Sequence, residues 1–507
     1  MDRLNIVLGN YHLAYGRNAF AMQAYLKASV AAPSDMSLRQ HIGVTSFLTG
    51  DYVGAEAWFS SIAHYRTFVS QELKLEEIPY RILDHTWMLA IGHVAFIDTY
   101  IKATKLGWYP EKKTLLAYNA ANPPSGWPLL RFFAKHITVL AANGDPTAAI
   151  DKLLFPERRP IVQSEQLAQL AQLVKLAQTT AAARTGEMAQ SVLATPPYIP
   201  EEPRPDTQQR DAMRRALSQD FWSGPDGSGR IRWFGPWGAA VEAAWKESGR
   251  PALFGLDADE RNAFRRLMAQ SHKLPEDAWY VLLHVREPGF HGRWHKAHPG
   301  TRNAEIGTYD KIIDFVVSRG GWVVRGGDPA MQPIPRREKV IDYATSDLRS
   351  PEIDVLLCAD CAYFAGTNSG YSVLPPVFGK RCALTNWSPI AIPNWYPDDI
   401  YIPKLVRDTK QNRYLTFQEM YSSFAGWSQF QRDFDRTDLR VEDNSPDDLL
   451  DAVMELHAEV FDEARGQTAE DEARLQRFNE IVLANGGYIG SRMSSRFLRR
   501  HADLLRP

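Results

Sequence analysis

Cysteine is scarce in this sequence, with three residues in a chain of 507. So few thiols exclude a disulfide scaffold and fit a reducing cytoplasm. No apolar run approaches the roughly 20 residues that a membrane span needs. The first residues, MDRLNIVLGNYHLAYGR, also lack the basic and apolar regions of a signal peptide. We therefore expect a cytoplasmic protein.

A large excess of one charge sign is also missing, because the formal net charge is −2. A chain so close to neutral has no general electrostatic attraction to nucleic acid, and we expect no nucleic-acid partner. Hydrophobic residues make up 44% and charged residues 23% of the chain, as in ordinary globular proteins. A chain of this length is too long to fold around a single hydrophobic core, so we expect several domains.

The front of the chain contains a repeat over about residues 1–70. Small and aromatic residues recur there at an offset of 34 residues, which is the tetratricopeptide period. The matched pairs are Gly9 and Gly43, Ala21 and Ala55, Tyr25 and Phe59, and Ala28 and Ile62. The pattern predicts two helical hairpins in which small residues let the helices approach. A generic helical hairpin domain is the alternative interpretation.

A parallel sheet is expected in the next part of the chain. Residues 87–107, WMLAIGHVAFIDTYIKATKLG, predict a strand, a tight turn at Gly92-His93 and a helix. Residues 112–122, KKTLLAYNAAN, predict the following strand. A strand, a helix and a second strand together favour parallel pairing.

Three later segments of this region connect or cover the expected core. Residues 164–183 keep an apolar seam and predict a helix, either as an inserted hairpin or as a dimerising coiled coil. Residues 195–206, TPPYIPEEPRPD, predict an extended connector. Residues 221–238, rich in Gly, Trp and Phe, predict an ordered loop.

From residue 275 onward, strands and helices alternate and predict a doubly wound sheet. Strands are expected in WYVLLHV, WVVRGGD (322–328), VIDYA (340–344), and the second halves of EIDVLLCADCAYFAGTNSG (352–370) and VLPPVFGKRCALTNW (373–387), with a helix in TYDKIIDFVVSRG (308–320). In such sheets, ligands bind beyond the carboxyl ends of the strands. The polar residues at these ends are His284, Arg286 and Glu287; Arg325 and Asp328; and Thr367, Asn368, Ser369 and Gly370.

The chemistry of these strand ends favours an anionic ligand. An arginine at a strand end binds phosphate with bidentate geometry. The loop GTNSG offers hydroxyl and backbone N–H groups ahead of an expected helix start near residues 370–373. Asp328 or Asn368 can accept hydrogen bonds from hydroxyl groups of a ribose or sugar. The alternatives are that Arg286 and Glu287 pair with each other or with a neighbouring loop, and that GTNSG is an ordinary turn.

A resemblance to a known family adds to this interpretation. The segments HVREPGF, TRNAEIGTY, RGGWVVRGGD, VIDYA, DVLLCADCAYFAGTNSG, FGK and TN, together with IGHVAFIDTY and SRFLRRHADLL, resemble a bacterial family of glycosyltransferases found in surface-carbohydrate loci. The likeness covers about residues 85–505. More remotely, the chain is similar to GT-B fucosyltransferase-like enzymes, whose His-x-Arg motif at a strand end holds the donor diphosphate.

The resemblance implies roles for individual residues. Arg286 would bind the donor phosphates and the GTNSG loop the diphosphate or ribose. His93 would act as the catalytic base, with a packing residue near a helix N-cap as the alternative. Glu287 is an alternative base, or it orients Arg286. The complete donor-binding set is His284, Arg286, Asn303, Arg325, Asp328, Thr367, Asn368, Ser369 and Gly370. The fucosyltransferases have a second Arg and an Asp where this chain has Glu287, Pro288 and Gly289, so the donor base stays open.

Three further features are not expected to carry chemistry. The CxxC of Cys358 and Cys361 has no second Cys/His pair at zinc spacing and predicts buried structural thiols in a strand. His291, His295 and His298 predict a polar loop rather than a metal site. The basic tail, residues 491–507, predicts a helix that packs back on the protein, with lipid contact as the alternative.

The sequence as a whole predicts an α/β protein of GT-B type, with two Rossmann-like domains facing a cleft behind a helical tetratricopeptide-like segment. The expected domains are residues 1–80 (helical), 81–270 (acceptor) and 271–507 (donor). The expected function is transfer of a sugar from a nucleotide-diphosphate sugar to a hydroxyl acceptor in surface-carbohydrate or glycoconjugate synthesis, without metal or cofactor. The acceptor would be a glycan, a lipid-linked sugar or a protein.

Other functions and partners stay open at this stage. The alternatives are a nucleotide-sugar epimerase or hydrolase of GT-B fold and a non-catalytic tetratricopeptide scaffold. The helical front offers a surface for a protein partner, and a peripheral contact with the inner membrane is open.

Overall fold

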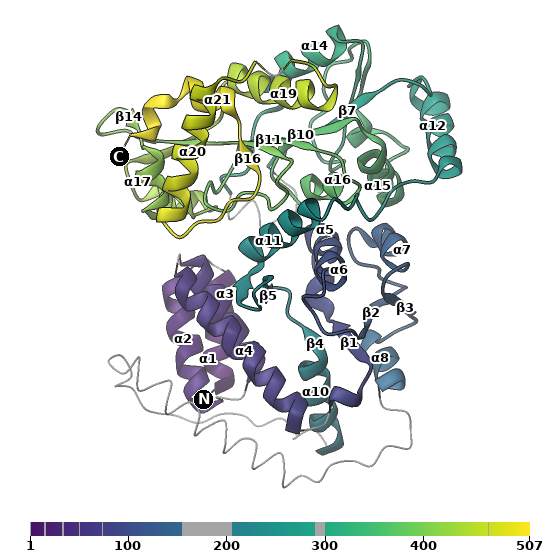
Figure 1. Cartoon of the computed structure of the whole chain (residues 1–507), viewed down its shortest axis with the longest axis vertical. Helices are drawn as coiled ribbons and strands as arrows, with labels where there is room; N and C mark the ends of the chain where they lie inside the picture. The colour runs from purple at the N-terminus through teal and green to yellow at the C-terminus, as the bar shows by residue number, and fades with distance from the viewer. Residues whose placement is uncertain are drawn as a thin grey trace. The chain divides into compact units, whose positions relative to one another are not determined.

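The computed structural model describes residues 2–14, 17–32, 35–49, 51–72, 75–154, 205–288, 300–464 and 466–506. The chain groups into two compact units, each made of three separate stretches of sequence (Figure 1). Unit 1 comprises Met1–His85, Glu111–Asn122 and Ile137–Phe234, and unit 2 comprises Thr86–Pro110, Pro123–His136 and Gly235–Pro507. The predicted domain boundaries at residues 80 and 270 stay a prediction.

Unit 1 begins with two helical hairpins. They consist of α1 (Asp2–Ala14), α2 (Asn18–Ala31), α3 (Met36–Leu48) and α4 (Tyr52–Glu72). A Cβ atom on Gly43 would lie 2.8 Å from the Phe59 ring, and one on Gly9 would come closer still to the Tyr25 ring. The glycines therefore leave the space that each aromatic ring fills, as the 34-residue pattern predicts. A helical front is confirmed, whereas its tetratricopeptide nature stays a prediction.

A four-stranded parallel sheet completes unit 1. Its order is β3-β2-β1-β4, from β1 (Tyr80–Leu83), β2 (Lys113–Asn119), β3 (Thr138–Ala142) and β4 (Ser218–Gln219). Helices α8 (Pro146–Leu154) and α10 (Pro205–Leu217) contribute Ile150, Leu154 and Leu217 to its core, beside Ile82 and Leu115. The hairpin of β5 (Ser223–Pro225) and β6 (Ile231–Trp233) occupies the segment predicted as an ordered loop.

The predicted strand at residue 87 is wrong, whereas the strand predicted at 112–122 is confirmed as β2. Residues 85–105 form η2 (His85–Met88), α5 (Ile91–Ala95) and α6 (Ile97–Lys105), and the strand lies earlier, as β1. Trp87 is fully buried against Phe96 and Tyr100. A continuous apolar run does not distinguish a buried helix from a buried strand. The predicted helix at 164–183 and most of the predicted connector lie outside the described residues.

Unit 2 is built around a seven-stranded parallel sheet with the order β16-β12-β11-β10-β7-β8-β9. The strands are β7 (Tyr280–His284), β8 (Trp322–Arg325), β9 (Val340–Ile341), β10 (Tyr363–Thr367), β11 (Cys382–Trp387), β12 (Ile400–Pro403) and β16 (Arg492–Met493). The central strands β7, β10 and β11 are buried along their whole length, as parallel strands covered on both faces are. The predicted doubly wound α/β half is therefore confirmed.

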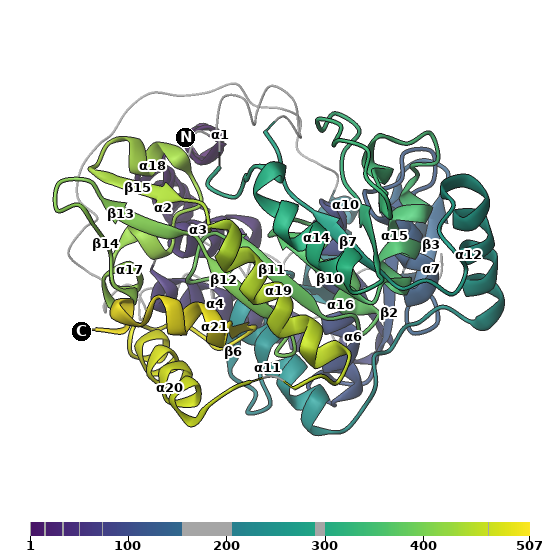
Figure 2. The same ribbon diagram turned by 90° about the horizontal axis from the view of Figure 1, so that it is seen from above.

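Helices cover both faces of this sheet (Figure 2). Helices α14 (Asp310–Ser318) and α19 (Pro446–Val460) lie on one face, and α15 (Pro351–Asp360) and α16 (Leu374–Val377) on the other (Figure 1). Helix α12 (Ala258–His272) precedes β7. A small antiparallel sheet with the order β14-β13-β15 follows β12. Its strands are β13 (Leu405–Asp408), β14 (Arg413–Tyr414) and β15 (Leu439–Glu442). The same segment contains the helices α17 (Phe417–Tyr421) and α18 (Gln431–Asp435).

A buried charged cluster joins α6 to α11 (Phe234–Glu247). Lys102 Nζ lies 2.7 Å from Asp98 Oδ2 and 2.8 Å from Glu242 Oε2, and all three side chains are buried. Burial raises the pKa of Glu242 to about 7, opposed by Lys102 and reinforced by Asp98. The hydroxyl of Tyr396 donates to Asp98 Oδ2 at 3.5 Å, and that of Thr99 to Glu242 Oε1 at 3.2 Å.

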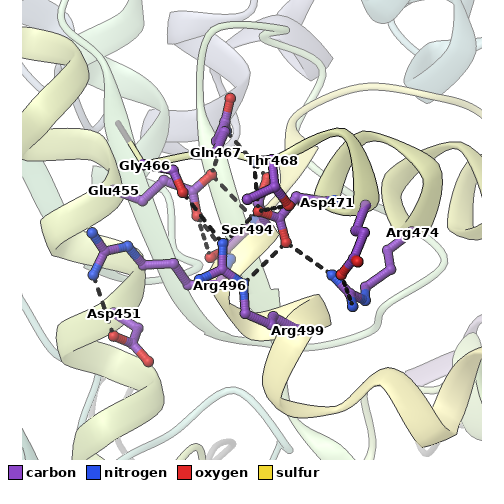
Figure 3. Close-up of polar contacts among 12 residues, drawn as sticks. Asp451, Glu455, Gly466, Gln467, Thr468, Asp471, Arg474, Ser494, Arg496 and Arg499 are labelled. Atoms are coloured by element: carbon purple, nitrogen blue, oxygen red, sulfur yellow. Dashed lines mark hydrogen bonds and ion pairs between the residues drawn. The ribbon is translucent and has the colours of Figure 1, made fainter. Parts of the chain in front are cut away.

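The C-terminal segment packs back on unit 2 through a polar network (Figure 3). Helix α21 (Ser495–Arg500) follows β16 and lies against α19 and α20 (Ala469–Ala484), before η8 (Ala502–Leu505). Glu455 of α19 accepts from Ser494 at 2.7 Å, Asp471 of α20 pairs with Arg474 and Arg499, and Arg496 pairs with Asp451. Arg496 and Arg499 of the tail are therefore paired with carboxylates of the protein itself, as expected for a helix that packs back on the fold.

No helix among the described residues is both long and apolar enough to cross a membrane.

All three cysteines are buried free thiols. Cys358 lies in α15 and Cys361 follows that helix, so the predicted strand at this position is wrong. Burial raises the pKa of each thiol. None is poised to react as a thiolate.

Candidate functional site

The site is built where β7 and β10 end side by side. These neighbouring parallel strands pair His284 with Gly366, so the residues that follow them emerge at the same edge of the sheet. The backbone N–H of Arg286 donates to Thr367 Oγ1 at 2.8 Å and joins the two strand ends. Glycine is required at position 366, because a Cβ atom there would collide with the His284 carbonyl.

Two arginines lie close together at this edge. Arg286 is buried, and its guanidinium donates to Asn303 Oδ1 at 2.9 Å. Burial lowers the pKa of Arg286, and burial together with the nearby positive charge of Arg286 lowers the pKa of Arg302 to about 10. The two guanidinium cations therefore repel each other in an environment that is shielded from water.

Arg302 has no counter-charge among the residues that the structure describes. Its side chain keeps part of its surface accessible, but its Nε atom is buried. Among the residues described by the structure, none hydrogen-bonds to that atom and none offers a carboxylate to this guanidinium. A buried charge left unpaired is costly, so an anion from outside the protein would stabilise this arrangement.

The GTNSG loop adds an unsatisfied acceptor beside β10. Asn368 is buried, and its Nδ2 group donates to the Ser388 carbonyl at 2.7 Å. Its Oδ1 atom has no hydrogen-bond partner among the described residues. Ser388 in turn shares a hydrogen bond of 2.5 Å with Thr301, the residue before Arg302. We call Arg286, Arg302, Asn303, Thr367 and Asn368 the arginine site.

The helix expected after GTNSG is present but very short. It consists of η6 (Tyr371–Val373) and the four-residue α16. Ser369 is used within the turn, where its hydroxyl accepts from the Tyr371 N–H at 3.1 Å. Two such short turns align few peptide dipoles, so the side chains of the arginine site, rather than a helix terminus, supply the positive field.

His284 is a neutral, buried residue. Its Nδ1 atom lies 3.0 Å from the Gly326 carbonyl oxygen, and its ring contacts Tyr371. Burial lowers the pKa of His284 to about 4, to which the charges of Arg286 and Arg325 contribute. The geometry fixes an Nδ1–H tautomer, which orients the residue behind the arginine site.

Arg325 and Glu287 satisfy each other across the sheet edge. Arg325 is fully buried and lies 2.5 Å from Glu287 and 3.0 Å from Asp342. Glu287 also accepts from the Gln332 N–H at 2.9 Å. Glu287 is therefore engaged by Arg325 and by the neighbouring loop at Gln332, which was one of the alternatives for this residue. Asp328 accepts from the Ala330 N–H at 2.8 Å, as an aspartate at a turn does.

His93 lies in α5, which contacts the GTNSG loop. A Cβ atom on Gly92 would sit 3.6 Å from Gly370 Cα, so the start of α5 touches that loop. The His93 Nδ1 atom lies 2.6 Å from the Thr86 carbonyl oxygen, and burial lowers its pKa below the usual 6.5. A histidine held this way is neutral at pH 7 and keeps Nε2 as its basic nitrogen.

The predicted site is brought together only in part. Arg286, Asn303, Thr367 and Asn368 gather at one point, whereas Arg325 and Asp328 are engaged elsewhere at the edge. Arg302 was missed, because it does not directly follow a predicted strand; its only signal was the string TRN, which also contains the predicted Asn303. His291, His295 and His298 lie outside the described residues, and within those residues no metal-binding group of three or more side chains occurs.

Comparison with known proteins finds no matching family model and no similar curated protein. A solved structure, that of the glycosyl transferase family 9 from Veillonella parvula, aligns with 75% of this chain and 96% of its own, at 10% identity and a TM-score of 0.36. A likeness at this level carries no conclusion about this chain.

Proposed function

We propose that this protein is a glycosyltransferase that moves a sugar from a nucleotide-diphosphate sugar to a hydroxyl acceptor. The observation that carries the proposal is the arginine site, where two guanidinium groups lie near each other and no described residue places a carboxylate on Arg302. A diphosphate offers several charged oxygens and matches two forked donors better than a single carboxylate does. The place at the carboxyl ends of central parallel strands fits ligand binding in α/β sheets.

The proposed reaction breaks the bond between the anomeric carbon and the diphosphate oxygen. The acceptor oxygen forms the new bond to that carbon and releases its proton to Nε2 of His93. Arg286 and Arg302 stabilise the negative charge on the leaving diphosphate, as fixed donors in a dry site do. Asn303 and Thr367 hold Arg286 in place, and Asn368 Oδ1 accepts a hydroxyl of the ligand. Two arginines provide the charge that other enzymes take from a metal ion.

The finer parts of the proposal follow from the family resemblance. They are a GT-B arrangement of two Rossmann-like domains, an acceptor that is a glycan, glycolipid or protein, a role in surface-carbohydrate synthesis, and recruitment through the helical front.

Nucleotide binding is the first test. In a thermal-shift panel of UDP, GDP, CMP and dTDP, we expect one nucleotide to raise the melting temperature. A charge-assisted hydrogen bond contributes about 1.5–3 kcal/mol. Arg286→Ala should therefore weaken the binding of that nucleotide by roughly 10- to 100-fold. Arg319→Ala, at an exposed ion pair with Glu463, is the matched control and should bind normally. No shift with any nucleotide in the wild-type chain would refute the transferase.

Acceptor dependence separates the transferase from its rivals. Release of free nucleotide from the donor sugar should require an acceptor hydroxyl. Release without an acceptor would indicate a hydrolase or epimerase, and binding without any turnover would indicate a scaffold.

A further inference from the structure

An apolar stripe runs along the outer face of α1. Leu4, Val7, Leu8 and Tyr11 are 59%, 61%, 40% and 48% exposed. Their spacing of three and four residues places them on one side of the helix. The opposite side carries Gly9, Ile6 and Leu13, which face the core formed with α2. The stripe is therefore a second apolar face on a helix whose first face is already packed.

The 34-residue register shows what such a face does in this fold. The positions of α3 that correspond to Leu4, Leu8 and Tyr11 are Leu38, Ile42 and Thr45, and these are 1%, 0% and 0% exposed. Leu38 and Ile42 are buried because they pack on Tyr25 and Ala28 of α2. The face that α1 presents to solvent is thus the face by which α3 docks on a neighbouring helix.

The chemistry of the stripe favours an identical surface as its partner. Residues 4–16 contain no Asp, Glu, Lys or Arg, so two copies of α1 meet without like charges. The corresponding docking side of α2 is already occupied by α3. A second copy of the chain therefore contributes its own α1 to the contact. Because a two-fold axis relates the two copies, both use the same surface, and the assembly is complete with two chains.

We propose that α1 is a homodimer interface in which the stripe of one chain packs on the stripe of a second copy. His12 extends the patch to Phe20, since their rings are 5.5 Å apart. A single helix face buries less than the roughly 800 Å² per partner of a standard stable interface. The dimer is accordingly reversible, with a dissociation constant on the order of micromolar. The contact involves neither the arginine site nor the proposed reaction.

The test is sedimentation of the full chain over a wide concentration range. As the concentration increases, the average mass of the wild type should rise from that of one chain to that of two. Val7→Glu should weaken association by about tenfold or more, because it buries a charge in an apolar contact. Leu483→Glu on α20, equally exposed at 59%, is the control and should dimerise like the wild type. A wild type that stays monomeric, a Val7→Glu variant that dimerises normally, or growth beyond two chains would each overturn the proposal.

A second measurement does not depend on the stability of a charged variant. Tyr11→Cys should be linked to its counterpart by a short bis-maleimide, giving a covalent dimer, because the native thiols are buried. Leu483→Cys should give none. Equal linking of the two variants would also overturn the proposal.

Discussion

At the scale of single residues, the arginine site and the Arg325 cluster show two different uses of a buried cation. Arg325 has two carboxylate partners within the fold, Glu287 and Asp342. Arg302 has none among the described residues and lies beside another cation. The charge of Arg325 is compensated within the fold, although its Nε atom also lacks a hydrogen-bond partner among the described residues. The charge of Arg302 is compensated, in our proposal, by a ligand. Stability measurements distinguish the two arginines.

Arg302→Met and Arg325→Met should therefore change stability in opposite directions. Without ligand, Arg302→Met should leave the free energy of unfolding unchanged or raise it by about 1 kcal/mol, because it removes an unpaired buried charge. Arg325→Met should lower it by about 3 kcal/mol, since two carboxylates lose their partner. Urea denaturation of both variants gives the comparison. Equal destabilisation would show that Arg302 is a structural residue.

The base proposed at His93 has a signature in the pH profile. Burial lowers its pKa, so transferase activity should fall only below pH 6.5, as the imidazole takes up a proton. His93→Gln should reduce kcat by about 100-fold or more, abolish this acid limb and leave nucleotide affinity unchanged. An acid limb that persists in His93→Gln would assign the base to another residue.

At the scale of helices and strands, the sequence pattern was most reliable where the elements are central. The strands from β7 to β11 and helix α14 were predicted from their apolar runs and the polar residues that follow. Helix α6 was also predicted, from the helical spacing after Gly92-His93. The preceding η2 and α5 were not, because WMLAIGHVAFI is apolar throughout and its partners, Trp237 and Trp395, lie more than a hundred residues away. Arg302 was missed because it does not directly follow a predicted strand, and its proximity to Arg286 is a property of the tertiary fold.

The cluster between α6 and α11 predicts a pH-dependent stability. The pKa of Glu242 is raised from 4.5 to about 7 in the folded chain, so the folded state holds this proton more tightly than the unfolded state. The contribution of Glu242 to stability is therefore complete below pH 4.5 and is lost as the pH rises through 7. Lys102 and Asp98 are the charged groups that face it, with Tyr396 and Thr99 as neutral neighbours.

Glu242→Gln carries no titrating proton at this position and isolates the effect. The free energy of unfolding of Glu242→Gln should increase relative to that of the wild type between pH 5 and pH 8, in parallel urea titrations. A difference that does not vary with pH would show that Glu242 is ionised throughout.

At the scale of the whole molecule, the two compact units are interleaved in sequence. Helices α5 and α6 belong to unit 2, although strands of unit 1 precede and follow them. Phe96 packs on Trp237 and Trp395, with ring centroids 5.2 and 4.7 Å apart. Apolar periodicity identifies elements but not the core that each one joins, so the sequence pattern did not place α5 and α6 in unit 2.

A fragment of residues 235–507 should consequently aggregate when it is produced alone. It lacks α5 and α6 and exposes the aromatic side chains that they cover. Production together with residues 1–234 should restore a soluble complex, measured as soluble yield and by light scattering. A soluble fragment with a cooperative melting transition would show that α5 and α6 are dispensable for unit 2.

The three buried thiols make this chain suited to spectroscopic labelling. Every cysteine of the sequence is covered by the fold and has a raised pKa, so maleimide dyes have no native target in the folded protein. One cysteine introduced at an exposed position in each unit therefore allows a donor dye and an acceptor dye to be attached while the three native cysteines are kept. Energy transfer between the dyes would report whether the distance between them changes when nucleotide binds.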